Sequence, residues 1–350
     1  MLQILNSDIL VDEKAWAGPN GELLQVHNSI EFNPNLIRSD IHGMWRYLPF
    51  LPLENEGNKV SVQEGFTPIC NLKYSDKKVR AKLEFLFPTG SYKDRGATFL
   101  LSKIKELGIK EIVEDSSGNA GCAIAAYSAI AQIKCKIVVP DSTSAAKIKQ
   151  IASYGAEVIK VSGSRTDATH KALELAKSTY FASHSYNPWF FQGTMTFAFE
   201  IWEQGKLPEE IIFPTGNGTL LLGAYLGFQK LKDSGIIHEI PKLSAAQADA
   251  CAPLFAQWKG FEFENAQETL AEGITVQKPI RANEILKAIQ VSGGKIYTVT
   301  EAEIKNSHLE LALQGIYAEF TSAVAHAAVK QSLNNDILIP VTGIGLKNKC

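Results

Sequence analysis

The order of strand-like and helix-like segments constrains the fold of this 350-residue chain more than any other feature. From residue 81 onward, short runs rich in β-branched residues alternate with longer helix-compatible runs. The predicted strands are 109–114, 135–139, 156–161, 210–213, 242–246, 297–299 and 337–341, and the predicted helices are 97–107, 120–131, 145–154, 166–178 and 220–232. Strands separated by helices favour parallel sheets with right-handed crossovers. The pattern therefore predicts an α/β fold with two open, mostly parallel twisted sheets and helices on both faces.

The length allows two domains, each with a substantial core. We expect a large domain formed by residues 1–84 plus 186–350 and a small domain formed by residues 85–185. In open α/β sheets, ligands bind at the carboxyl ends of the strands. A ligand cleft is therefore expected at the strand ends, between the two domains.

Composition excludes several classes of function. With 45% apolar residues, 21% charged residues and a formal net charge of −2, the chain has no electrostatic footprint for nucleic acid or for an anionic membrane. Asp8 and Asp12 interrupt the N-terminus, which does not resemble a secretory signal, and the run 120–133 is too short and polar to span a bilayer. We expect a cytoplasmic protein.

The five cysteines are scattered, and no two of them have C-x-x-C spacing. This arrangement favours reduced thiols over a disulfide framework or a zinc site. No metal site is predicted from the sequence.

A lysine stands at a strand-to-helix junction in the stretch Pro88–Gly96. Pro88 and Gly90 end the strand-like segment 82–87, and a helix-compatible run follows Lys93. A lysine at such a junction can project into a cleft, although a lone lysine is more often a solvated surface residue. Two later loops favour a functional role for Lys93 over a surface position.

Both of these loops, 116–119 and 216–219, lie between a predicted strand and a predicted helix. The first N–H groups of a helix have no partner within the helix and attract anions. Residues 116–119 suit a carboxylate, or act as a simple helix cap. Residues 216–219 suit a phosphate because glycines let the backbone approach it, or form a generic turn. Their spacing matches neither a Walker loop nor a dinucleotide-binding fingerprint.

Together, these three stretches resemble the pyridoxal 5′-phosphate (PLP) enzymes of the tryptophan-synthase-β type (fold type II), and within them the threonine synthases. Ser91–Gly96 matches the family motif S-[FY]-K-D-R-G. The resemblance implies PLP as cofactor and Lys93 as the catalytic residue that forms the Schiff base with it. It also implies that Asn119 bonds the cofactor O3′. The residues implied to hold the cofactor phosphate are Gly216, Asn217, Gly218 and Thr219; those implied to hold the substrate are Ser116, Ser117, Gly118 and Asn119.

The last predicted strand leads into Pro340–Lys347, which resembles the threonine-synthase ending T-G-H-G-L-K. The resemblance places the Thr342 hydroxyl on the ring nitrogen of PLP. A carboxylate in that position would keep the ring protonated, whereas a hydroxyl can leave it neutral. We therefore expect elimination or replacement to be favoured over transamination. A strand-end threonine with no such role is the alternative reading.

The segment 186–201 resembles N-P-x-R-x-x-G-x-K-T-x-A-x-E-I, but Phe190 replaces the arginine and Met195 the lysine. Ala120 and Ile344 also depart from the family pattern. A lost guanidinium removes bidentate phosphate recognition. Ser185 is a candidate substitute contact to the substrate.

Three functions remain open at this point. The first is threonine synthase, which converts O-phospho-L-homoserine and water to L-threonine and phosphate. The second is a related PLP enzyme that performs β-elimination or β-replacement on another amino acid. The third is a non-catalytic binding protein on the same fold. In each case we expect a small amino acid as ligand and a homodimer as the assembly.

Overall fold

The computed structural model describes residues 1–74, 76–143 and 145–347. The chain folds into two compact units. Unit 1 is Met1–Gly65 with Lys93–Thr196, and unit 2 is Phe66–Tyr92 with Phe197–Cys350. These units group residues 1–65 with the segment that begins at Lys93. The sequence predicted a different grouping, with residues 1–84 and 186–350 in one domain. That domain division stays a prediction.

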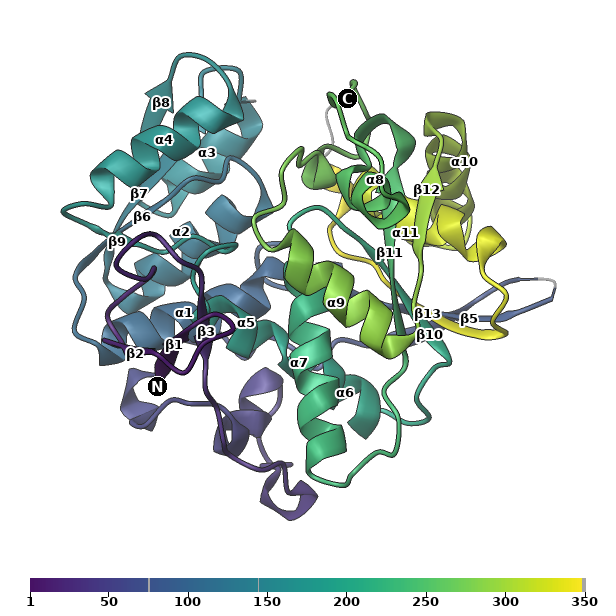
Figure 1. The fold of residues 1–350 in the computed structure, drawn as a ribbon, viewed down its shortest axis with the longest axis horizontal. Coiled ribbons are helices and arrows are strands. Elements are labelled where there is room, and N and C mark those ends of the chain that lie inside the picture. The colour runs from purple at the N-terminus through teal and green to yellow at the C-terminus, as the bar shows by residue number, and fades with distance from the viewer. Residues whose placement is uncertain (75, 144, 348–350) are drawn as a thin grey trace. The chain divides into compact units, whose positions relative to one another are not determined.

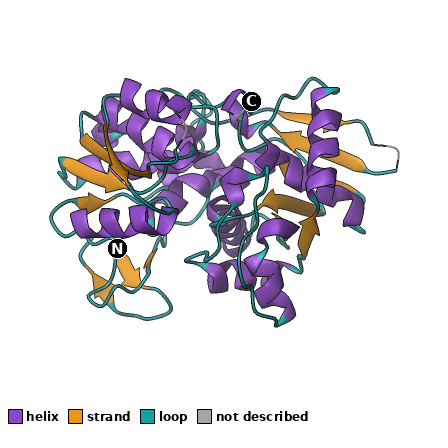
Figure 2. Ribbon diagram, turned by 90° about the horizontal axis from the view of Figure 1, so that it is seen from above, coloured by secondary structure: helices purple, strands orange, loops and turns teal. Residues whose placement is uncertain are grey.

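Unit 1 contains a four-stranded sheet in the order β8-β7-β6-β9, in which every pair is parallel (Figure 1). The strands are β6 (Glu111–Glu114), β7 (Lys134–Pro140), β8 (Glu157–Val161) and β9 (Tyr180–Phe181). The helices are α1 (Lys93–Glu106), α2 (Asn119–Ala131), α3 (Ala145–Ser153), α4 (Arg165–Leu175) and α5 (Trp189–Thr194). Figure 2 shows helices on both sides of these strands. A small antiparallel sheet, which the sequence analysis did not predict, is formed by β1 (Leu2–Ile4), β2 (Leu10–Val11) and β3 (Leu24–Val26).

Local sequence explains where the helices of unit 1 begin and end. The Ser164 and Asp167 side chains form a reciprocal capping box that starts α4. Helix α2 ends at Gln132, which adopts the left-handed conformation with φ 57°. Helices α1 and α5 approach closely because Gly193 has no side chain. A Cβ atom there would lie closer than 3.0 Å to the carbonyl of Arg95.

Unit 2 contains a six-stranded sheet in the order β12-β11-β10-β13-β5-β4. Only the edge pair β4–β5 is antiparallel among these described strands. The strands are β4 (Ile69–Leu72), β5 (Lys78–Lys82), β10 (Glu210–Pro214), β11 (Lys242–Ala248), β12 (Ile296–Val299) and β13 (Asp336–Pro340). The helices are α6 (Thr196–Glu203), α7 (Thr219–Asp233), α8 (Pro253–Lys259), α9 (Ala282–Ser292), α10 (Glu301–Ala312) and α11 (Phe320–Ala328).

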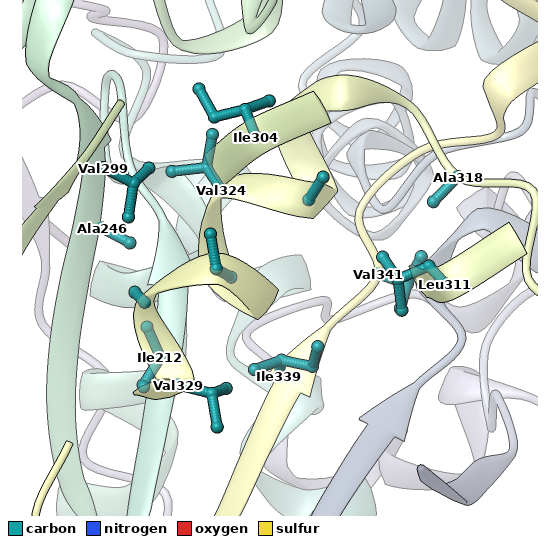
Figure 3. Close-up of a cluster of buried hydrophobic side chains, with 14 of the residues drawn as sticks. Ile212, Ala246, Val299, Ile304, Leu311, Ala318, Val324, Val329, Ile339 and Val341 are labelled. Atoms are coloured by element: carbon teal, nitrogen blue, oxygen red, sulfur yellow. The ribbon is translucent and has the colours of Figure 1, made fainter. Parts of the chain in front are cut away.

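The core of unit 2 lies between the sheet and the helices α10 and α11. Figure 3 shows Val324 of α11 beside Val299 of β12 and Ile304 of α10. All three side chains are at most 1% exposed. Burying apolar side chains of this size stabilises the fold by about 1.5–3 kcal/mol each. This packing fixes the start of α11 against the end of β13, where Thr342 follows.

One local prediction was wrong. The segment 82–87 was read as strand-like, but β5 ends at Lys82 and residues 84–86 form a 3-10 helix. The Glu84 side chain is fully buried and accepts a 2.6 Å hydrogen bond from the Thr67 hydroxyl. A buried carboxylate needs such a partner, and this contact outweighs the strand propensity of the surrounding apolar residues.

Four cysteines lie in the described part of the chain, and each carries a free thiol. Cys350 falls outside the described residues. No helix in the described ranges is both long enough and apolar enough to cross a membrane.

Candidate active site

Lys93 is the first residue of α1, directly after the chain crosses from unit 2 to unit 1. The loop before it is held to the end of β13. The Tyr92 N–H donates to the Thr342 carbonyl at 3.1 Å, and Ser91 forms a bridge with Gly343. The structure thus places Lys93 at the start of a helix, next in sequence to an anchored tyrosine, and a 3-10 helix rather than a strand comes before the loop.

Phe190 packs against the first turn of α1. Its ring is fully buried, and the Lys93 Nζ lies 5.8 Å from the ring centroid. A Cβ atom on Gly96 would come closer than 3.0 Å to three carbons of the ring, so glycine at this position makes room for it. Met195, the second departure from the family motif, is 2% exposed. Both apolar replacements are therefore packed core residues of unit 1.

Glu114 and His184 form a buried pair in the same unit. The Glu114 Oε1 lies 2.8 Å from His184 Nδ1, and Glu114 Oε2 accepts a hydrogen bond from the His184 backbone N–H at 3.2 Å. Burial raises the pKa of the Glu114 carboxyl well above its usual value, and the Asp115 charge raises it further. Burial lowers the pKa of His184 well below its usual value, as do the positive charges of Lys93 and Arg165. Both shifts favour the uncharged forms of this hydrogen-bonded pair.

The predicted substrate loop leads from β6 into α2. Ser116 is 4% exposed, and its hydroxyl accepts the Gly118 N–H at 3.3 Å. No described side chain caps the start of α2 at Gly118. Backbone N–H groups at such a helix start favour an anion, so the carboxylate site expected at 116–119 stays a prediction. Ser185 is 7% exposed, and its hydroxyl lies 3.3 Å from that of Ser183.

In unit 2, the predicted phosphate loop leads from β10 into α7. Gly218 adopts φ 65°, and no described side chain caps this helix. A Cβ atom on Gly216 would lie 3.0 Å from Ile274 Cα, so the loop backbone packs closely on its neighbour. The Tyr92 hydroxyl lies 2.8 Å from Thr219 Oγ1. Since the Tyr92 backbone also bonds Thr342, one tyrosine connects the phosphate loop to the end of β13.

Thr342 is 2% exposed, and its hydroxyl has two neighbours that were not expected from the sequence. It lies 3.0 Å from Ser322 Oγ and 3.2 Å from Glu319 Oε1. Glu319 is the N-cap residue of α11 and makes no side-chain cap hydrogen bond to that helix.

The residues present fit PLP. The uncapped N-terminus of α7 and its glycines suit a phosphate, and a hydroxyl with a carboxylate behind it suits a ring nitrogen. Ser91 Oγ is fully buried and has no hydrogen-bond partner among the described residues. A buried hydroxyl of this kind requires a partner, which a ligand can supply. The Lys93 amine follows two positions later in the chain.

Comparison with known proteins decides the family. A family model described as "Pyridoxal-phosphate dependent enzyme" matches residues 60–343. The chain belongs to this family. It is 34% identical to the threonine synthase of Methanocaldococcus jannaschii, over 97% of this chain and 90% of the relative. Identity to the threonine synthase of Methanosarcina acetivorans is 32%, over 91% and 81% of the two chains.

Among solved structures, threonine deaminase isoform 2 from Solanum lycopersicum superposes on this PLP-family chain with a TM-score of 0.72. The two are 19% identical, and 91% of this chain and 92% of that one are covered. This likeness confirms the predicted α/β fold class. The family match and the names of the relatives confirm the predicted family and PLP as its cofactor.

Proposed function

We propose that this PLP-family enzyme is a carbon–oxygen lyase of the threonine synthase type, which converts O-phospho-L-homoserine and water to L-threonine and phosphate. One observation carries the proposal: Lys93 stands at the head of α1 in a chain that matches a protein named threonine synthase over 97% of its length. Two helix N-termini without side-chain caps among the described residues, those of α2 and α7, offer donors for the two anionic groups.

Bound PLP would supply an electron sink for bonds at the α carbon of an amino acid. The Lys93 amine would hold the cofactor and, when free, would accept and return the proton at Cα of the substrate. Asn119 would bond the cofactor O3′, and residues 216–219 would bind its phosphate through backbone N–H groups. The loop 116–119 would bind the substrate carboxylate.

A second candidate is β-elimination or β-replacement on another amino acid. The observation that favours it is the burial of Phe190 and Met195, which are 0% and 2% exposed and carry no charge. A charge-assisted hydrogen bond contributes roughly 1.5–3 kcal/mol, so losing one weakens phosphate binding by about ten- to more than a hundred-fold. For O-phospho-L-homoserine, a replacement contact from Ser185 would then be needed. A purely non-catalytic role has less support, because Lys93, Asn119 and Thr342 are all present.

Borohydride reduction of the PLP-loaded protein, followed by peptide mapping, tests the cofactor link. We expect the label on Lys93, its loss in Lys93→Ala, and its retention in Lys105→Ala, a change at an exposed lysine of the same helix. A label on another lysine would contradict the assignment.

Incubation with candidate amino acids then separates the two reactions. We expect threonine and phosphate from O-phospho-L-homoserine. Release of ammonia or replacement products from serine or cysteine, with no turnover of O-phospho-L-homoserine, would support the second candidate instead.

The expected homodimer and the cytoplasmic location belong to the same proposal. The cytoplasmic location rests on the reduced cysteines and on the biosynthetic reaction. Sedimentation equilibrium of the purified chain measures the assembly, and a monomer mass across the concentration range would contradict the dimer.

A further inference from the structure

The Ser322 hydroxyl has one possible hydrogen-bond direction toward Thr342. Its oxygen accepts the Thr342 N–H at 2.9 Å and the Gly343 N–H at 3.3 Å. A hydroxyl has two acceptor lone pairs and one hydrogen. Both lone pairs are used by backbone donors, so the hydrogen remains for the third contact. In the 3.0 Å contact between the two hydroxyls, Ser322 therefore donates to Thr342.

The direction of the Thr342 hydrogen follows from the next contact. Thr342 Oγ1 lies 3.2 Å from Glu319 Oε1, and an ionised carboxylate only accepts hydrogen bonds. The Thr342 hydroxyl therefore donates its hydrogen to Glu319. With one lone pair occupied by Ser322, the other lone pair is what Thr342 presents to any further partner. Toward that partner, Thr342 is an acceptor.

The Glu319 carboxylate is built into this arrangement. A Cβ atom on Gly343 would lie closer than 3.0 Å to its Cδ and to both carboxylate oxygens, so the carboxylate lies directly against the Gly343 backbone. The Glu319 N–H also donates to the Gly343 carbonyl at 2.9 Å. The side chain is 9% exposed and makes no cap hydrogen bond to α11 among the described residues. Backbone pairing and close packing thus hold the carboxylate behind the Thr342 hydroxyl.

We propose that Glu319 and Ser322 orient Thr342 as a hydrogen-bond acceptor, so that this site selects the protonated, pyridinium form of the PLP ring. The inference rests on the proposed function, in which the ring nitrogen faces Thr342. A neutral pyridine nitrogen is itself an acceptor and would face the Thr342 lone pair without a hydrogen between them. A pyridinium N–H donates into that lone pair, and the Glu319 charge behind it offsets the positive charge. The proton comes from solvent when the cofactor binds.

The expectation drawn from residue type alone changes accordingly. A threonine can donate or accept, and on residue type alone its hydroxyl can leave the ring neutral. The donors and acceptors around Thr342 instead leave it as an acceptor toward the ring nitrogen, which favours a protonated ring. A protonated ring is the stronger electron sink, and it suits a reaction that must stabilise charge at more than one carbon of the substrate.

Nitrogen NMR tests the inference on PLP labelled with ¹⁵N in the ring and bound to the full chain. Free PLP in acid and in alkali provides the reference shifts for the protonated and neutral nitrogen. We expect the wild type at neutral pH to show the protonated shift. Glu319→Ala should move the signal to the neutral position, because the freed Thr342 hydrogen can then donate to the ring. The control Glu264→Ala removes an exposed carboxylate of the same unit and should leave the signal unchanged.

Each outcome bears on one claim. If borohydride fails to link the cofactor to Lys93, the proposed function fails before the ring is measured. If the cofactor is linked and the wild-type nitrogen is neutral, the inference is wrong while the proposed function stands. If the wild-type nitrogen is protonated and Glu319→Ala leaves it so, Glu319 does not set the direction. The wild-type measurement decides the main claim even if Glu319→Ala does not fold.

Discussion

Replacing Gly96 with alanine should force apart the two helices beside Lys93. The added Cβ would lie closer than 3.0 Å to three carbons of the Phe190 ring, whereas ordinary contact begins at 3.4 Å. The ring must therefore move by at least 0.4 Å, the difference between these two distances. Phe190 is 0% exposed, so it has no free volume into which to move. Overpacking of this kind costs about 1–3 kcal/mol, and we expect the upper half of that range for Gly96→Ala.

A double-mutant cycle turns this clash into a measurement. Phe190→Ala alone should cost about 3–5 kcal/mol, because it removes a buried ring. If the two changes were independent, the double variant would lose about 5–8 kcal/mol, comparable with the whole stability of many domains. We expect it to lose only about 3–5 kcal/mol, since the alanine methyl enters the space that the ring vacates.

Urea unfolding of the four proteins, followed by fluorescence of Trp189 in the same helix as Phe190, provides the assay. Borohydride labelling of Lys93 should fall in Gly96→Ala and recover in part in the double variant. A neutral Gly96→Ala, or free energies that simply add, would refute the packing argument.

Two further predictions concern buried charge. Lys82 and Glu200 are both 0% exposed and form a 2.9 Å ion pair. Glu200→Gln should lower the free energy of unfolding by about 3–5 kcal/mol, because it leaves the buried ammonium without its carboxylate. A loss below about 1 kcal/mol in urea unfolding would contradict this. Burial lowers the pKa of His326 to about 4, although Glu310 opposes the shift and Lys330 adds to it. Because the unfolded histidine titrates near 6.5, stability should fall by up to about 3 kcal/mol as the pH drops from about 6.5 to 4. His326→Gln should flatten that slope, and an unchanged slope in thermal unfolding across this pH range would show that another group is responsible.

The sequence by itself determined the features that depend on local order along the chain. Alternating strand and helix patterns predicted both parallel sheets, because side-chain periodicity reports secondary structure directly. The motif around Lys93 and the loops at 116–119 and 216–219 were found because glycines and small polar residues mark strand-to-helix turns. These positions need no knowledge of distant residues.

Only the tertiary structure decided how these residues can act. From the sequence, Phe190 was interpreted only as the loss of an arginine. The packing of α5 on α1 showed that its ring is buried against Gly96. From the sequence, the Thr342 hydroxyl could be either a hydrogen-bond donor or an acceptor. Its direction depends on Ser322 and Glu319, some 20 residues earlier in the chain. A hydrogen-bond direction is set by the full set of donors and acceptors around an atom, and folding brings that set together from separate segments. For that reason the sequence could predict the family of this site, whereas the protonation state that the site favours emerged only from the folded arrangement.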